Sequence, residues 1–144
     1  MSGQLVLASD VIVRFKGKIL LVKRGHEPYK GMMSLPGGRQ EKDESIEETA
    51  LREVKEETGL DVKLKEILGV YSSPFRDPRF HAVSVVFIAD SKSSLARAGS
   101  DAEEVFWMKP EEIDTNNLAF DHGKMIRDYL LWKKRKQTFW SSKN

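Results

Sequence analysis

The strongest structural constraint in this sequence is the apolar segment at residues 82–89, AVSVVFIA. It carries no charged side chain, and its β-branched residues favour an extended conformation. A polar alternation would indicate a strand with one solvated face, whereas a nearly continuous apolar run indicates a strand buried on both faces. We therefore expect this segment to lie inside a sheet, although the segment alone does not define the topology.

Other segments complete a mixed pattern of strands and helices. Asp43 or Ser45 can cap a helix that carries Glu47 and Glu48 in its first turn and ends at Gly59. Further strands are expected at 5–15, 18–23, 62–71 and 104–108, with a turn of helix at 110–112 and a last helix at 120–136. These elements predict a mixed α/β or α+β domain.

The length of 144 residues suits a single domain that spans residues 1–144, with 137–144 expected as a loosely ordered tail. The absence of cysteine excludes a disulfide scaffold, a thiolate metal site and a cysteine nucleophile. No apolar run approaches the ~20 residues of a membrane helix, and the first ten residues do not resemble a secretory signal. We therefore expect a cytoplasmic protein without a membrane partner.

Charge is unevenly distributed in a chain whose net charge is only +2. Residues 41–57 contain eight acidic and three basic residues, a local net charge of −5, whereas residues 124–143 contain seven basic residues and one acidic residue. An acidic patch of this kind can attract cations. The basic region ends near Trp140, but without a second basic and aromatic stripe we interpret it as a solvated helix end and expect no nucleic-acid partner.

Three glutamates of the acidic segment share one face of the expected helix. Glu53, Glu56 and Glu57 have i, i+3 and i+4 spacing, and the apolar stripe of the helix overlaps one end of their arc. Glu53 and Glu57 should therefore lie at the edge of the packed interface, where like charges repel. Mg²⁺ relieves this repulsion because it prefers carboxylate and water oxygens. For the three acids alone, a solvated acidic helix is the competing interpretation.

Neighbouring residues can support such a metal site. Arg52 can pair with a carboxylate and hold its orientation, and Glu44 is its expected partner if the start of the helix folds back. The pair Gly37-Gly38 allows close approach of the backbone, so that a carbonyl there, at Gly37, could join the metal ligands.

The whole segment from Gly38 to Leu60, GRQEKDESIEETALREVKEETGL, carries these residues at fixed spacing. It resembles the complete signature of the Nudix hydrolase family, without a departure. The resemblance implies an α/β/α sandwich around a mixed β-sheet. It also implies hydrolysis, dependent on Mg²⁺ or Mn²⁺, of a nucleoside diphosphate linked to another moiety. By position, Glu53, Glu56 and Glu57 match the metal ligands of the family, and Arg52 and Glu44 match its supporting pair.

The expected mechanism uses a water molecule rather than a covalent nucleophile, because cations on the pyrophosphate polarise phosphorus and lower the pKa of bound water. The water needs a base. Asp101 and Glu103 are the preferred candidates, since Glu104 lies nearer the following strand. Each of them fits a polar loop equally well, and Glu53 is the alternative base.

The segment after the signature resembles the ADP-ribose pyrophosphatase branch of the family. Pro74 follows Gly59 by fifteen residues and precedes Arg76-Asp77-Pro78-Arg79. Two arginines in a proline-stiffened loop can bind phosphate or ribose oxygens, although a surface turn is the simpler interpretation. The segment from Leu118, LAFDHGKMIRD, is also similar to that branch, and its Phe120 or His122 could line an adenine pocket, although a core phenylalanine and a helix-capping histidine are the simpler interpretation.

The function expected from this resemblance is hydrolysis of ADP-ribose to AMP and ribose 5-phosphate. One alternative is a Nudix hydrolase for a nucleoside triphosphate, a dinucleoside polyphosphate or another nucleotide sugar. A second is a nucleotide-sensing domain without catalysis, although such a domain would be expected to lose carboxylates that are present here. By analogy with the same branch we expect a homodimer.

Overall fold

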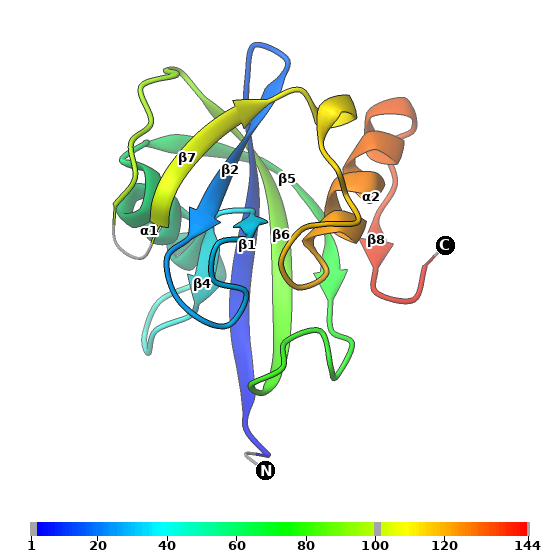
Figure 1. Cartoon of the computed structure of the whole chain (residues 1–144). Helices are drawn as coiled ribbons and strands as arrows, with labels where there is room; N and C mark the ends of the chain where they lie inside the picture. Colours follow the sequence, from blue (N-terminus) through cyan, green and yellow to red (C-terminus); the bar gives the residue numbers. More distant parts are fainter. Residues whose placement is uncertain (1–2, 100–101, 144) are drawn as a thin grey trace.

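The computed structural model describes residues 3–99 and 102–143, and the strands in these residues form one eight-stranded mixed sheet (Figure 1). Its main path runs in the order β3-β2-β1-β6-β5-β8, while β4 pairs with β1 and β7 pairs with β2. The strands are β1 (Leu5–Phe15), β2 (Lys18–Arg24), β3 (Met33–Ser34), β4 (Gly37–Arg39), β5 (Val62–Tyr71), β6 (His81–Ser91), β7 (Ala102–Met108) and β8 (Phe139–Trp140).

The centre of the sheet is the parallel pair of β1 and β6, which align from Leu5 beside His81 to Arg14 beside Asp90. Alternate residues of β6 belong to two different hydrophobic clusters: Val86 and Ile88 to one, Phe87 and Ala89 to the other. The prediction that the segment 82–89 is buried on both faces is therefore confirmed.

One face of the sheet is covered by α1 (Ile46–Thr58). Ala50 and Val54 of this helix are fully buried and pack in the cluster that contains Val11 and Val13 of β1. Ser45 and Glu48 form a capping box at its start, with each side chain hydrogen-bonded to the backbone of the other residue. A left-handed Gly59 ends the helix, so both predicted boundaries are confirmed.

The opposite face is covered by α2 (His122–Lys134), which begins two residues later and ends two residues earlier than expected. Met125, Ile126, Tyr129 and Trp132 pack in the second cluster, together with Ile12 of β1. A short 3-10 helix, Pro110–Glu112, lies between β7 and α2. The two helices thus give the expected α/β/α sandwich. Among the described residues, no helix is both long and apolar enough to cross a membrane.

Within the segment 137–144, which was expected as a loosely ordered tail, residues 139–140 form strand β8. Phe139 and Trp140 pair with β5 in a parallel bridge, and Phe139 is buried in the cluster under α2. Gly69 permits this contact, since a Cβ atom there would overlap the backbone of Phe139. Burial of a large aromatic side chain and main-chain pairing therefore fix the segment to the sheet.

Candidate active site

A pocket of about 460 Å³ opens where β4, α1, the β5–β6 loop and the start of α2 meet. This volume falls in the range of small-molecule sites. Carboxylates of α1 lie on one side of the pocket, and arginine and aromatic side chains lie on the other. The predicted site residues that line the pocket are Gly37, Glu53, Glu57, Arg76, Arg79 and Phe120.

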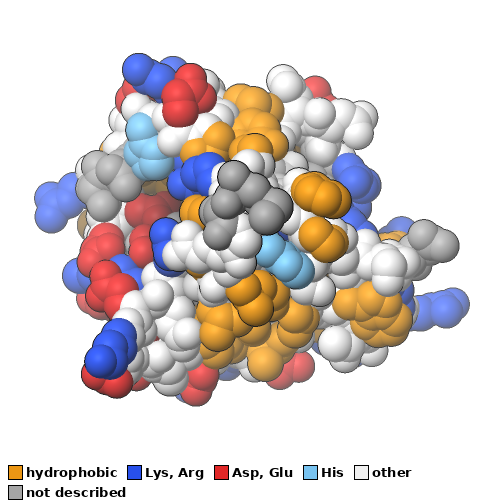
Figure 2. Space-filling model, turned by 90° about the horizontal axis from the view of Figure 1, so that it is seen from below, with side chains coloured by type: hydrophobic (Ala, Val, Ile, Leu, Met, Phe, Trp, Pro, Cys, Tyr) orange, Lys and Arg blue, Asp and Glu red, His pale blue; other side chains and the backbone are white. Residues whose placement is uncertain are grey.

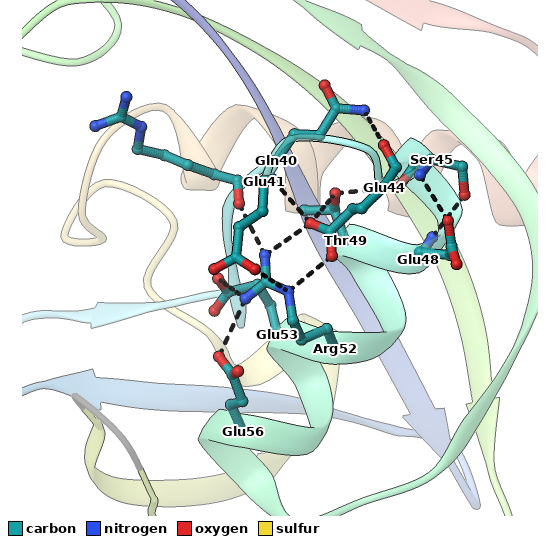
Figure 3. A network of polar contacts seen from close by, with 10 residues as sticks. Gln40, Glu41, Glu44, Ser45, Glu48, Thr49, Arg52, Glu53 and Glu56 are labelled. Atoms are coloured by element: carbon teal, nitrogen blue, oxygen red, sulfur yellow. Dashed lines mark hydrogen bonds and ion pairs between the residues drawn. The ribbon is translucent and has the colours of Figure 1, made fainter.

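Arg52 is the centre of the polar contacts at the acidic side (Figure 3). Its Nε and Nη2 atoms donate to the two carboxylate oxygens of Glu44 at 2.9 and 2.8 Å. Its Nη1 donates to Glu53 at 3.0 Å and to Glu56 at 3.1 Å, and its Nη2 also donates to the carbonyl of Arg39 at 2.9 Å. The expected pairing of Arg52 with Glu44 is confirmed, and one guanidinium joins α1 to the loop before it.

The same contacts set the charge states of the pair. The hydrogen bond from Arg52, the backbone N–H of Glu41 and the hydroxyl of Thr49 lower the pKa of Glu44 from 4.5 to about 2. The hydrogen bond to Glu44 likewise raises the pKa of Arg52, although partial burial opposes this. Glu44 therefore stays ionised across the physiological range and gives Arg52 a fixed orientation.

Glu53 and Glu57 form a pair of neighbouring carboxylates, one helical turn apart, at the edge of the α1 interface, where the sequence predicted them to lie. Burial raises the pKa of Glu53, against the lowering effect of Arg52. Burial also raises the pKa of Glu57 well above its ordinary value, and the nearby Glu53 carboxylate adds to this increase. Two carboxylates held together at a partly dry surface fit a hard divalent cation, which would compensate their charge.

Glu56 is arranged differently from the other two glutamates. Its side chain is 47% exposed and is turned toward Arg52, whereas that of Glu53 is only 15% exposed. In the parts of the chain that the structure describes, no three Asp, Glu, His or Cys side chains converge closely enough to hold a metal ion. The structure therefore brings Glu53 and Glu57 together and places Glu56 next to them, bound to Arg52.

The glycine pair explains how the sheet approaches these carboxylates. Gly38 of β4 lies directly against Glu53, because a Cβ atom on Gly38 would overlap the Glu53 carboxylate. The backbone of Gly37 lowers the pKa of Glu57, against the larger effect of burial. The absence of a side chain at Gly38 thus lets the main chain lie against the acidic pair, which is the close backbone approach that the glycine pair predicted.

The other side of the pocket carries a stack of alternating guanidinium and phenyl groups. Arg79 lies over Phe80 at 4.7 Å and over Phe120 at 5.9 Å, measured from the guanidinium carbon to the ring centroid. Arg39 lies over Phe80 and Arg24 lies over Phe120, both at 4.9 Å. These groups offer positive charge and flat apolar surface to an anionic, ring-containing ligand.

The two arginines of the β5–β6 loop have different environments. Arg79 is half exposed and is held by two hydrogen bonds to the carboxylate of Asp77. Arg76 lines the pocket, but its side chain is only 5% exposed and makes a bidentate pair with Asp121 at 2.8 and 2.9 Å. Pro74 is exposed and does not line the pocket. Arg79 is therefore the better placed of the two for contact with a ligand.

The candidates for a catalytic base also differ in placement. Glu103 of β7 is exposed, and its carboxylate pairs with Lys23 at 3.2 Å, while Glu104 lies 3.7 Å from the same ammonium group. Asp101 lies outside the described residues. Glu53 is the one candidate base of the described residues that lines the pocket.

Sequence analysis missed several residues that line the pocket, among them Asp10, Arg24, Arg39 and Phe80. One signal was available for Asp10, because a carboxylate in the middle of an apolar strand is unusual. Arg24, Arg39 and Phe80 carry no comparable signal, since charged and aromatic residues near strand ends are common on ordinary surfaces.

Comparisons with known proteins agree with this geometry. A family model described as the NUDIX domain matches residues 5–129. The chain is 52% identical over 130 residues to a protein named ADP-ribose pyrophosphatase from Methanocaldococcus jannaschii. The aligned region covers 88% of this chain and 74% of that protein.

Solved structures give the same result. A NUDIX hydrolase from Nitrosomonas europaea superposes with a TM-score of 0.83 at 28% identity, over 95% of this chain and 77% of that one. The NUDIX domain of NrtR from Shewanella oneidensis, crystallised with ADP ribose, superposes with a TM-score of 0.76 at 27% identity, over 89% and 88% of the two chains.

Replacement of Gly38 by alanine tests the contact between β4 and the acidic pair. We expect Gly38→Ala to lower turnover by about 100-fold, because the new methyl group must displace the Glu53 carboxylate. The free energy of unfolding should change by no more than about 1 kcal/mol, since the displaced group is the end of a flexible side chain. Steady-state kinetics and urea unfolding measure the two effects, with the exposed Lys42→Ala as control. Full turnover in Gly38→Ala would show that this position of Glu53 is not required.

The pair of Glu44 and Arg52 predicts a pH dependence of stability. The folded-state pKa of Glu44, about 2, lies below its ordinary value of 4.5. The contribution of the ionised Glu44 to the free energy of unfolding is therefore complete above about pH 4.5 and disappears as the pH falls toward 2. The free energies of unfolding of Glu44→Gln and the wild type, measured in urea, should differ most at neutral pH and converge as the pH falls from 4.5 toward 2. A constant difference for Glu44→Gln would contradict the prediction.

Proposed function

Since the chain belongs to the Nudix family of hydrolases, we propose that it hydrolyses ADP-ribose to AMP and ribose 5-phosphate with Mg²⁺ or Mn²⁺. The observation that carries this proposal is the pocket itself, in which the acidic pair of α1 faces the stack of arginine and phenylalanine side chains. A substrate with a charged pyrophosphate between two ring systems matches both sides. The likeness to an ADP-ribose pyrophosphatase at 52% identity supports the same substrate.

Three glutamates of α1 and one backbone group would hold the metal. Glu53 and Glu57 already lie together, Gly37 lies against Glu57, and Glu56 would join them by leaving Arg52. A bound divalent cation would neutralise pyrophosphate charge and lower the pKa of a coordinated water. Glu44 keeps its charge and holds Arg52, so that the carboxylates are not free to rotate away when the substrate binds.

The chain's own residues supply the remaining steps. Arg79, with Arg24 and Arg39, would bind phosphate and ribose oxygens, while Phe120 would contact the adenine ring. Glu53 lines the pocket and would accept the proton of the attacking water. Glu103 could take this role only after its pair with Lys23 opens, and Asp101 is the third candidate.

A second candidate function is a sensor that binds the nucleotide without cleaving it. One observation favours it, namely the likeness to the NUDIX domain of NrtR in complex with ADP ribose. The complete set of signature carboxylates, and the ion pairs that hold them, favour catalysis instead. Other Nudix substrates, such as nucleoside triphosphates or dinucleoside polyphosphates, differ from ADP-ribose in phosphate number and are separated from it by a substrate panel.

We also propose a homodimer in which a second copy covers the apolar part of the α1 face of the sheet. Leu5, Leu7, Ile67 and Val70 are 64%, 47%, 52% and 41% exposed. By strand register they share the face of Val11, beyond the end of the area that α1 covers. Figure 2 shows hydrophobic side chains gathered along the lower margin of the molecule, beside a charged region. Exposed apolar patches of this kind commonly mark an interface.

The cytoplasm is the compartment we propose for this reaction. A chain without cysteine has no need of an oxidising environment. A nucleotide substrate is also consistent with an intracellular location.

A comparison of the wild type with Glu57→Gln tests ADP-ribose hydrolysis and its dependence on metal together. The wild type, freed of metal with a chelator, should release AMP from ADP-ribose only after Mg²⁺ or Mn²⁺ is added. Glu57→Gln should turn over at least about 100-fold more slowly with its fold intact, because it removes one charge of the acidic pair. Product chromatography and calorimetric titration with Mn²⁺ measure turnover and metal uptake.

Several outcomes separate the competing functions. The exposed Glu47→Gln on the same helix serves as control and should match the wild type. Tight ADP-ribose binding without product would support the sensor, and a preference for triphosphates would change the substrate. Activity that survives the chelator would contradict the metal assignment.

The dimer is tested by light scattering. The wild type should have twice the chain mass at micromolar concentration, while Leu7→Lys should be a monomer, because a buried ammonium group without a partner is costly. Lys63→Glu, a change on β5 outside the patch, should remain dimeric. A monomeric wild type would contradict the proposal.

A further inference from the structure

A second polar cluster lines the pocket with buried side chains and has no part in the mechanism described above. His122, Asp10 and Arg76 are 3%, 8% and 9% exposed. Burial of such groups is costly unless they are hydrogen-bonded. Among the described residues, every buried side-chain nitrogen and oxygen has a hydrogen-bond partner. The hydrogen-bond partners of His122, Asp10 and Arg76 therefore identify the parts of the chain that these residues hold in place.

His122, the first residue of α2, binds the backbone of the segment between β3 and β4. The N–H of Leu35 donates to its Nδ1 at 3.0 Å, in a buried contact between residues 87 positions apart. Because an N–H can bind only a nitrogen with a free lone pair, the ring proton lies on Nε2. This atom faces Oδ1 of Asp10 at 3.5 Å.

Asp10 is held on its other side and lies against the same segment. The hydroxyl of Ser84 donates to its Oδ2 at 2.7 Å. Asp10 is the β-sheet partner of Gly37, and a Cβ atom on Gly37 would overlap both the Asp10 carboxylate and the backbone of Ser9. The side chain of Asp10 therefore packs directly against Gly37.

The segment of residues 35–37 is thus fixed at each of its three residues. Leu35 is bound by His122, the carbonyl of Pro36 accepts the N–H of Val11 at 2.9 Å, and Gly37 packs on Asp10. The next residue, Gly38, lies directly against the Glu53 carboxylate, and the Gly37 backbone lowers the pKa of Glu57 against the effect of burial. A shift of this segment would move the backbone that lies against the acidic pair.

We propose that His122 and Asp10 are positioning residues, which hold the segment 35–37 so that the backbone that continues from it into Gly38 lies against the acidic pair of Glu53 and Glu57. The proposal rests on the proposed function, since it assigns these residues to the same site. They act through Leu35 and Gly37 and need no contact with the substrate.

Arg76 connects this support to the β5–β6 loop. Its bidentate pair with Asp121 holds the residue that precedes His122, and its Nη2 lies 3.7 Å from Oδ2 of Asp10. Asp121 occupies the N-cap position of α2 but makes no side-chain capping bond there, since both of its carboxylate oxygens bind Arg76. One buried cluster therefore connects the loop that carries Arg79 to the segment beside Glu57.

The test compares two substitutions of His122. His122→Asn keeps an oxygen close to the position of Nδ1 that can accept the Leu35 N–H, whereas His122→Leu fills similar space without an acceptor. For His122→Leu we expect kcat to fall about 10- to 100-fold, with KM for ADP-ribose changed less than about 3-fold. His122→Asn should recover most of the lost kcat. The control is Met125→Leu, another buried position of α2 outside this cluster, which should match the wild type.

Two spectroscopic measurements do not depend on activity. Long-range ¹⁵N–¹H correlation should show the wild-type His122 ring protonated on Nε2 only. Amide exchange of Leu35 should accelerate about 10-fold or more in His122→Leu and stay close to the wild-type rate in His122→Asn.

The outcomes are distinguishable. The proposal is overturned if Leu35 exchange is unchanged in His122→Leu, if the ring proton lies on Nδ1, or if His122→Asn is as impaired as His122→Leu. A wild type that does not hydrolyse ADP-ribose would refute the proposed function alone, because the exchange and ring-proton measurements would still decide the positioning role.

Discussion

The ion pairs of Arg52 are the interaction on which the rest of the site depends. Its guanidinium binds Glu44, Glu53 and Glu56 and also the carbonyl of Arg39, so that it joins two turns of α1 to the loop before the helix and to β4. A lysine could neutralise one of these carboxylates but could not hold several of them in fixed directions, because its ammonium group lacks the planar fork of donors. The geometry of the acidic pair is therefore set before any ligand binds.

The sheet makes this arrangement possible by bringing distant parts of the chain to one place. The parallel pairing of β1 and β6 puts Asp10 opposite Val86, and the pairing of β4 with β1 puts Gly37 beside Asp10. Both helices contribute residues to the pocket beside Asp10, α1 with its glutamates and α2 with His122. The β5–β6 loop supplies further lining groups, because loops can carry such groups on a fixed scaffold.

The sequence predicted the long strands and the two α-helices well, because those features depend on local patterns, whereas it did not predict the short strands β3, β4 and β8. Spacing along one helix determines which glutamates are neighbours, and a capping serine and a terminal glycine define its ends. The residues that it did not predict depend on contacts between distant segments. Arg76 looked like a ligand-binding arginine, but its role depends on Asp121, 45 residues later, and the order of the C-terminal segment depends on the absence of a side chain at Gly69. No local pattern contains such information.

The division of charge across the pocket has a consequence for specificity. Glu53 and Glu57 would repel a pyrophosphate in the absence of a cation, whereas Arg24, Arg39 and Arg79 attract it on the opposite side. A ligand with phosphates alone would satisfy the arginines but leave the faces of Phe80 and Phe120 without a partner. A ligand with rings alone would gain nothing from the cation. Only a molecule that joins a diphosphate to a ring can use both sides at once, and this requirement selects a nucleoside diphosphate derivative over either part.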